Sequence, residues 1–417
     1  MKDARIVLDN EYNTYYAGQT LNGRIEYEFD SPIKVRGIYV RFKGEANTAW
    51  TETKEEQTST QTDQAQYETR DTMHTGHEEY FNIMYYMLGS AEGSEIEIPA
   101  GKQVYNFTCT LPPVLPSSFE SQYGYVRYTL KVTLDRPWQF DHHTKLAFTV
   151  INPLDLNLNN SYKEPIHLQM EKTFCCLWCA SSPLTVDVRA PVSGYCPGQV
   201  IPINVDIENK SNVQVHLVQV ALRRVVTFRA TTPTSATKIL REVVVEIQEG
   251  PAPAGSTKHW DMRLEVPSIP PSNLVNCGII DLDYDLNVVC KVSGLHQNLT
   301  GKKYVTIGTV PLMGQLAVPT APPPRPVRDD PAVLPVSPGP PMDSYGGDTS
   351  GWTVPGAQPP YQSLYPTLTQ PVYKVSPYTA RTIQDREDRN HTQVVGPTSF
   401  APCYPTYAAV QPPPLPQ

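Results

Sequence analysis

The sequence predicts an all-β protein with two antiparallel β-sandwiches in tandem, followed by a disordered proline-rich tail. Three observations predict this architecture. Apolar and polar residues alternate along short segments, one phrase of sequence occurs twice, and more than half of the 42 prolines follow Val318. Alternation with a period of two is typical of strands that bury one face. A chain of 417 residues suits two domains and an additional segment.

The alternation is clearest in the first half of the chain. One parity is apolar from Leu21 to Phe29 and again from Ile38 to Phe42. The same pattern continues at Tyr105, Phe107, Cys109, Tyr128, Leu130, Val132 and Leu134. Prolines in "LPPVLPSS", which begins at Leu111, cannot donate to a sheet ladder, so we expect a connection there. This half therefore predicts a sandwich of short strands.

The second half repeats the first. The segment "YAGQTLNGRIEYEFDSPIKVRGIYVRF" aligns without a gap with "CPGQVIPINVDIENKSNVQVHLVQVAL", so that Gly18 meets Gly198. Two later pairs follow in the same order: "LPPVLPSS" with "VPSIPPSN", and "KLAFTVINPL" with "KYVTIGTVPL". We therefore predict one sandwich in residues 1–155, a second in 156–314, and a tail in 315–417. Each aligned glycine is expected in a turn that needs a positive φ.

Composition argues against several classes of function. The net charge is −8 and the pI about 5.6, without a dense basic run, which argues against a nucleic-acid partner. The first residues, "MKDARIVLDNEY", lack the apolar core of a signal peptide, and the eight cysteines lack a regular disulfide spacing. No G-x-S-x-G or H-E-x-x-H motif occurs. We expect a cytoplasmic protein that is not an enzyme and has no cofactor.

Three stretches carry a family resemblance. They are "YxxGQxLxGxIxYxF", "LPPVLPSSFESQYGYVRYTLKVTLDRPW" and "KTFCCLWCASSPL…GYCPGQ". Together they resemble the α-arrestins, the arrestin-domain-containing proteins, over residues 5–313. The resemblance implies an arrestin fold and an adaptor that connects membrane receptors and transporters to ubiquitin ligases and endosomal sorting. It also implies association of a cytoplasmic protein with the plasma membrane and endosomes.

The start of the tail contains two overlapping short motifs. Pro319-Thr320-Ala321-Pro322 matches the P-[ST]-A-P motif that the ubiquitin-E2-variant domain of ESCRT-I reads, and such motifs occur in similar tails of the family. Pro323, Pro326 and Arg328 match an SH3 ligand, in which a polyproline II ridge fills aromatic grooves and the arginine meets an acidic rim. Both matches can also arise by chance in a proline-rich segment. An SH3- or WW-binding signalling scaffold without a ubiquitin role is the alternative function.

Three further motifs bear on ubiquitin ligases. Family tails carry P-P-x-Y motifs for the WW domains of HECT-type ligases, whereas this tail has only x-P-x-Y. A WW groove holds one proline between aromatic rings and places the tyrosine in a second pocket, so x-P-x-Y loses one contact. Several weak sites on one chain can still act together through effective concentration. The candidate residues are Pro371 with Tyr373, Pro402 with Tyr404, and Pro405 with Tyr407.

Cysteines at 175, 176 and 179 lie between the two repeats. Three thiols in "FCCLWC" suggest a metal site or acylation at a membrane, but a structural zinc site needs four ligands. We favour an apolar strand that opens the second sandwich. Cys109, Cys277 and Cys290 are expected in the core.

Two polar regions have competing interpretations. The insert from Thr51 to Glu79 contains "HTGHEE", which suggests metal ligands at His74, His77 and Glu78, but we favour a solvated mobile loop. Basic side chains in the second repeat either contact phosphorylated cargo or anionic lipid, or cover the wet face of strands. These side chains are Arg223, Arg224, Arg229, Lys238 and Arg241. Peripheral association with a membrane would be compatible with the first interpretation.

Overall fold

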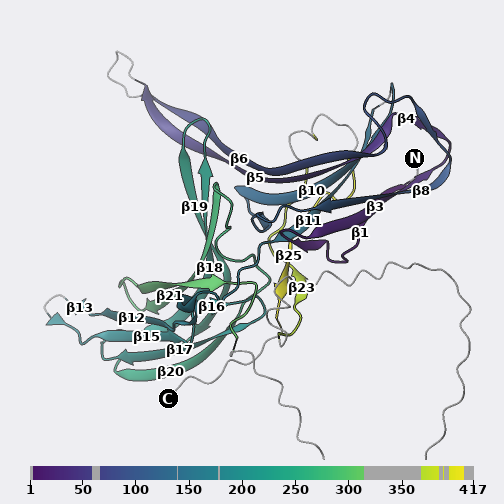
Figure 1. The fold of residues 1–417 in the computed structure, drawn as a ribbon. Coiled ribbons are helices and arrows are strands. Elements are labelled where there is room, and N and C mark those ends of the chain that lie inside the picture. Colours follow the sequence, from purple (N-terminus) through teal and green to yellow (C-terminus); the bar gives the residue numbers. More distant parts are fainter. Residues whose placement is uncertain are drawn as a thin grey trace, which may run out of the picture.

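The structure is a computed structural model that describes residues 3–58, 66–138, 140–176, 179–313, 368–384, 388 and 394–407. Two β-sandwiches follow one another along the chain and lie at an angle to each other (Figure 1). Apart from the single 3-10 turn η1 (Asn160–Lys163), the named elements of the described part are strands. The all-β tandem sandwich that the sequence predicts is confirmed.

The first sandwich has two layers. One is a three-stranded sheet in the order β1 (Asp3–Leu8), β3 (Thr20–Phe29), β8 (Gly101–Thr110). The other has the order β2 (Thr14–Tyr16), β11 (His142–Ile151), β10 (Gly124–Asp135), β5 (Gly37–Thr58), β6 (Gln66–Gly89). Short pairs add β9 (Phe119–Glu120) to β10, and β4 (Ile33–Val35) to β7 (Ile96–Ile98). The apolar parities predicted from the sequence face the space between these layers, where Leu21, Ile25, Val40 and Leu130 are fully buried.

The second sandwich repeats this plan. One sheet has the order β12 (Ile166–Lys172), β15 (Leu184–Ala190), β17 (Val200–Asn209), β20 (Ser256–Glu265). The other has the order β16 (Gly194–Tyr195), β22 (Leu299–Ile307), β21 (Ile280–Val292), β18 (Val215–Ala230), β19 (Ala236–Glu249). The short parallel pair β2–β11 of the first sandwich recurs as β16–β22.

The duplicated sequence makes duplicated hydrogen bonds. Gly18 and Gly198 have φ of +84° and +85°, as expected for the turn that each precedes. The side-chain oxygen of Gln19 accepts from the Tyr16 amide, and that of Gln199 accepts from the Cys196 amide, at 2.8 and 2.7 Å. The glutamine that follows each glycine therefore fixes the turn, which explains the repeated Gly-Gln pair.

Two buried tyrosines show the same duplication. The hydroxyl of Tyr128 in β10 donates to the Pro116 carbonyl at 2.7 Å, and that of Tyr284 in β21 donates to the Pro270 carbonyl at 2.8 Å. Each acceptor lies in one of the proline-rich connections that the sequence predicts between strands. The tyrosines satisfy carbonyls that the connections would otherwise bury without a partner.

The insert from Thr51 to Glu79 is not a loop, which corrects the sequence-based expectation. Its described parts continue β5 and β6, which pair from Gly37 with Gly89 to Thr58 with Gln66. The Thr53 hydroxyl donates to Asp71 across the two strands at 2.6 Å. Threonine favours strands, and cross-strand polar pairs support them, so a polar composition did not exclude sheet here. The hairpin extends from the first sandwich past β19 of the second (Figure 1).

Several contacts join the two sandwiches where this hairpin crosses. Thr75 in β6 exchanges backbone hydrogen bonds with Thr232, and the Thr48 hydroxyl donates to the Arg229 carbonyl at 2.7 Å. The rings of Phe119 and Phe228 lie 6.5 Å apart across the same junction. The two cores therefore meet in one continuous apolar cluster.

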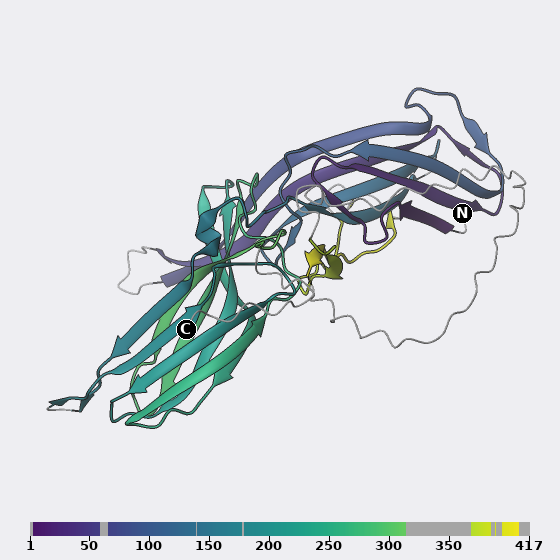
Figure 2. The same ribbon diagram turned by 60° about the horizontal axis from the view of Figure 1, so that its bottom comes forward.

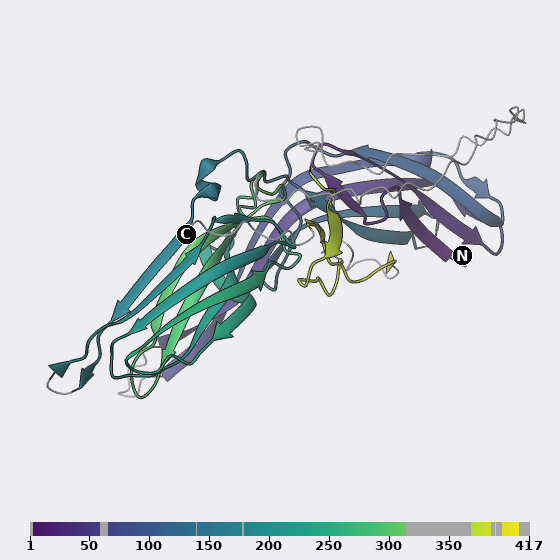
Figure 3. The ribbon, with the colours of Figure 1, turned by 90° about the horizontal axis from the view of Figure 1, so that it is seen from below.

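The end of the chain returns to this junction. Strand β23 (Val372–Val375) pairs with β25 (Cys403–Thr406), and β24 (Val394–Val395) pairs with His143 and Thr144 of β11. Figures 2 and 3 show β23 and β25 in yellow between the two sandwiches. These parts of the tail differ from the disordered tail expected from the sequence, and residues 314–367 lie outside the described residues.

The cysteine-rich segment also differs from its expectation. The second sandwich opens with β12, whereas β13 (Cys175–Cys176) and β14 (Cys179–Ala180) pair only with each other in a separate small hairpin. Leu177 and Trp178 lie outside the described residues. An apolar run of this length predicts a strand but does not reveal which sheet it joins.

Candidate functional site

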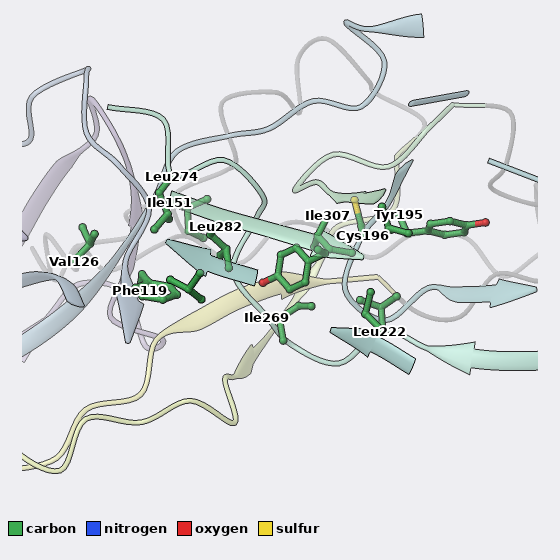
Figure 4. Close-up of a cluster of buried hydrophobic side chains, with 14 of the residues drawn as sticks. Phe119, Val126, Ile151, Tyr195, Cys196, Leu222, Ile269, Leu274, Leu282 and Ile307 are labelled. Carbon is green, nitrogen blue, oxygen red and sulfur yellow. The ribbon is translucent and has the colours of Figure 1, made fainter. Parts of the chain in front are cut away.

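Two of the three x-P-x-Y motifs lie in a cleft between the sandwiches. We call residues 402–407 the tail peptide, and we call its binding surface the cleft, formed by Ser118, Thr149, Pro197, Gly198 and Thr309. Tyr404 and Tyr407 are each 1% exposed, and Pro402 and Pro405 are buried. Figure 4 shows the yellow ribbon of the tail passing beside Phe119 of the first sandwich and Ile269 of the second.

Hydrogen bonds hold the tail peptide on the first sandwich. The Cys403 amide donates to the Thr149 hydroxyl oxygen at 3.0 Å, and the Tyr404 hydroxyl donates to the Ser118 carbonyl at 2.7 Å. Burial raises the pKa of the Tyr404 hydroxyl well above its ordinary value, so this hydroxyl is a proton donor throughout the physiological range.

Matching bonds hold the tail peptide on the second sandwich. The Tyr407 amide donates to the Pro197 carbonyl at 2.9 Å, and its hydroxyl donates to the Thr309 carbonyl at 2.7 Å. A Cβ atom on Gly198 would lie 2.1 Å from the Tyr407 carbonyl oxygen. Gly198 is therefore needed both for its positive φ and for the close approach of the tail.

The third motif is less enclosed. Pro371 and Tyr373 are half-buried, the Tyr373 hydroxyl lies 2.9 Å from the Tyr16 hydroxyl, and its ring is 5.4 Å from that of Tyr12. Tyr373 also pairs with Pro405 in the register of β23 and β25. The structure thus brings all three motifs into one assembly, with the last two the most deeply buried.

The carboxylate of Asp388, a residue of the tail, is buried against the outer face of the first sandwich. It pairs with Lys131 at 3.0 Å and with Lys145, and the side chains of Asp388 and Lys145 are 0% and 2% exposed. The two lysines face each other directly on β10 and β11. Like charges in that arrangement repel, so a carboxylate between them stabilises the sheet.

A second buried ion pair lies next to the cleft. The guanidinium of Arg127 donates twice to the Glu120 carboxylate, at 2.8 Å in each case, and donates once to the Thr382 carbonyl of the tail at 3.1 Å. Burial raises the pKa of Glu120, and the adjacent Arg127 opposes that rise. The Arg224 guanidinium lies 3.3 Å from the centre of the Tyr378 ring, so both sandwiches hold the tail by an arginine.

An open cavity of about 660 Å³ lies between the hairpin and the second sandwich. Its lining is mainly polar: Lys43 pairs with Glu45 at 2.9 Å, and Asn47 donates to the Tyr125 hydroxyl at 2.9 Å. The hydroxyl of Tyr125 in turn donates to Glu45 at 3.2 Å. These groups already satisfy one another.

The histidines of the insert do not gather into a metal site. His74 is buried against Trp50, with its Nε2 3.2 Å from Glu52, and His77 lies 3.0 Å from the Asn47 side-chain oxygen. The Gly278 amide of the second sandwich donates one bifurcated hydrogen bond to the two carboxylate oxygens of Glu78, at 3.1 Å to each. In the described ranges, no group of three or more histidine, cysteine or acidic residues could hold a metal ion.

The basic residues of the second repeat divide into two groups. Arg223 makes a bidentate pair with the buried Asp285, and Arg224 pairs with Glu242 while donating to the Glu120 carbonyl. One interpretation placed these two arginines on a solvent-exposed strand face. The structure does not place them there. The remaining ones are closer to solvent: Arg229 is about half exposed, Lys238 lies over Tyr123, and Arg241 is exposed.

Cys109 and Cys290 lie in the core, as expected, while Cys277 is half-buried. Burial raises the pKa of Cys109 to about 11 and that of Cys290 to about 12, so both remain thiols. The side chains of Cys175, Cys176 and Cys179 lie outside the described residues, as do Pro319, Thr320, Ala321, Pro322, Pro323, Pro326 and Arg328. No described helix has the length and apolar character of a membrane span.

Sequence reasoning missed Asp388, Lys131, Lys145 and Glu120. The sequence contained one indication of this site. Lys131 and Lys145 lie at polar positions of adjacent strands, where two like charges repel each other unless an anion lies between them. Asp388 itself sits in a charged stretch, "QDREDR", which gives no indication of burial.

Comparison with known proteins agrees with the duplicated architecture. Family models for the arrestin N-terminal and C-terminal domains match residues 4–157 and 180–312. Arrestin domain-containing protein 17 of Caenorhabditis elegans is 28% identical over 96% of this chain and 98% of its own length. Human arrestin domain-containing protein 4 is 27% identical over 73% of this chain and 71% of its own length. Mouse arrestin domain-containing protein 1 is 25% identical over 66% of this chain and 58% of its own length. The chain belongs to the α-arrestins, the arrestin-domain-containing family, and is an arrestin-like adaptor.

Proposed function

We propose that this adaptor links membrane receptors and transporters to HECT-type ubiquitin ligases and to ESCRT-I, and so directs their endocytosis and endosomal sorting. The observation that carries the proposal is that one chain combines a two-domain arrestin body with a tail that contains one P-T-A-P and three x-P-x-Y motifs. The body would bind cargo at the cytoplasmic face of the plasma membrane and endosomes, without nucleic acid or a cofactor.

The structure supports a rigid body for this role. Hydrogen bonds at Thr48 and Thr75, and the apolar contact at Phe119, connect the sandwiches directly. The long hairpin places further polar groups beside the second sandwich, around the open cavity. Such a body can present one extended surface to a cargo tail, while short motifs in the tail recruit other proteins.

The test separates the two recruitment steps. Proximity labelling in cells compares the intact chain with Pro322→Ala, and with a variant in which Tyr373, Tyr404 and Tyr407 are changed to alanine. We expect Pro322→Ala to lose ESCRT-I and the tyrosine variant to lose WW-domain ligases, while both keep cargo. Retention of both machineries by the two variants would refute the proposal. Loss of partners on Arg328→Ala instead would favour the SH3 scaffold.

A further inference from the structure

We propose that the cleft is a binding site for a proline–tyrosine peptide, and that it competes with WW domains for the tail peptide. The inference rests on the proposed capture of x-P-x-Y motifs by ligases. It adds that the folded body controls access to two of these motifs.

The same side chains of the tail peptide cannot bind the cleft and a WW domain at the same time. A WW groove holds the proline between aromatic rings and encloses the tyrosine ring. In the cleft both rings are already enclosed, since Tyr404 and Tyr407 are each 1% exposed. Their hydroxyls donate to Ser118 and Thr309, one on each sandwich. A WW domain can therefore bind the tail peptide only after it leaves the cleft.

The cleft binds the backbone of the tail peptide as well as its side chains. The amides of Cys403 and Tyr407 donate to Thr149 and Pro197. The missing side chain of Gly198 leaves room for the Tyr407 carbonyl. A combination of backbone pairing with pockets for particular side chains is the usual basis of peptide recognition.

Contacts made by other residues of the tail help to hold the tail peptide in place. Asp388 joins Lys131 and Lys145, and Tyr378 stacks on Arg224. None of these groups belongs to an x-P-x-Y motif. The balance between docked and released tail can therefore be altered without changing the sequence that a WW domain reads.

Access differs among the three motifs. Tyr373 is half-buried, whereas Tyr404 and Tyr407 are each 1% exposed. The motif at Pro371 is thus the first that a ligase can reach. Its capture would separate β23 from β25 and weaken the docking of the tail peptide.

The experiment measures binding of the purified tandem WW domains of a HECT-type ligase to four samples. These are the full chain, a synthetic peptide of residues 398–410, the full-length variant Asp388→Lys, and the full-length control Glu92→Lys. Glu92 is an exposed loop residue away from the cleft. Glu92→Lys therefore changes the net charge by the same amount as Asp388→Lys without altering the tail. Far-UV circular dichroism confirms that both variants are folded. Tyr378→Ala is a further full-length variant that releases the tail without a new buried charge.

We expect the peptide, Asp388→Lys and Tyr378→Ala to bind about a hundredfold more tightly than the full chain, because a released fraction near one hundredth lowers the apparent affinity by that factor. Glu92→Lys should bind like the full chain. Equal binding of the full chain and the peptide would overturn the competition.

Hydrogen exchange at the Cys403 and Tyr407 amides tests the cleft without a ligase. We expect protection in the full chain and in Glu92→Lys, and its loss in Asp388→Lys. A peptide that fails to bind WW domains would overturn ligase capture and the competition together. Protected amides in that case would show that peptide binding by the cleft holds independently, and unprotected amides in the full chain would overturn it.

Discussion

Strands β10 and β21 occupy the same place in the two copies of the module, yet their surroundings differ. Tyr128 and Tyr284 anchor them in the same way. In β21 the outward residues Asn287 and Val289 remain half-buried, whereas the matching residues of β10, Lys131 and Thr133, are buried. The difference arises on the outer face, where Asp388 and β24 of the tail lie against the first sandwich. Both copies of the strand thus bury an apolar face in their own core, and the first copy also carries the tail on its outer face.

The residues opposite these positions on the neighbouring strands also differ. Lys131 faces Lys145 on β11, while Asn287 faces Lys302 on β22. Only the first pair brings together two cations, and it is bridged by the tail. The second pair needs no such bridge, because a neutral amide lies opposite the lysine and Lys302 is exposed.

The largest expected effect concerns the reactivity of these lysines. Removal of residues 368–417 should raise the rate at which an amine-reactive reagent modifies Lys131 and Lys145, on the order of a hundredfold if tail docking contributes about 3 kcal/mol. Lys302 and Lys303 are exposed and should react equally in both forms. Mass spectrometry of labelled peptides gives the rates. Continued protection of Lys131 in the truncated chain would show that the tail does not cover it.

Asp388→Ala should lower the free energy of unfolding by about 3 kcal/mol, because it leaves two buried ammonium groups without this carboxylate. The matched change Asn287→Ala in β21 should cost less than about 1 kcal/mol. Urea unfolding of the full chain measures both. Similar losses for the two variants would contradict the proposed difference between the strands.

Alanine substitution should destabilise the protein more at Gly198, which contacts the tail, than at Gly18. Alanine at Gly18 is expected to cost about 1–2 kcal/mol from its positive φ alone, since the nearest atom to an added Cβ is 3.6 Å away. Alanine at Gly198 should cost about 1–2 kcal/mol more, because the Tyr407 carbonyl blocks the Cβ. Thermal unfolding compares the variants. The additional loss should disappear when residues 368–417 are removed.

The smallest effect is expected where the copies agree. Tyr128→Phe and Tyr284→Phe should each cost about 1–2 kcal/mol, since each leaves one buried proline carbonyl without its donor. Equal values within about 0.5 kcal/mol, measured by urea unfolding, would support a common core plan. A much larger loss at one site would show that the two connections are not equivalent.

The fold class, the duplication and the inward-facing residues followed from the sequence by itself. Alternation from Leu21 to Phe29 and the repeated Gly-Gln turn are local patterns, and local patterns depend on residues that are neighbours in the chain. The P-T-A-P and x-P-x-Y motifs were equally visible as short strings.

The position of the tail was decided only by the tertiary structure. The burial of Tyr404 and Tyr407 depends on Ser118 and Thr309, which lie far away in the sequence and on different sandwiches. Asp388 likewise meets its lysines only after both sheets have formed. A polar, proline-rich composition indicates that a segment cannot build a core of its own, but it does not exclude docking on a core that is already folded. That is the physical reason why the same tyrosines look like free ligands in the sequence and are enclosed in the structure.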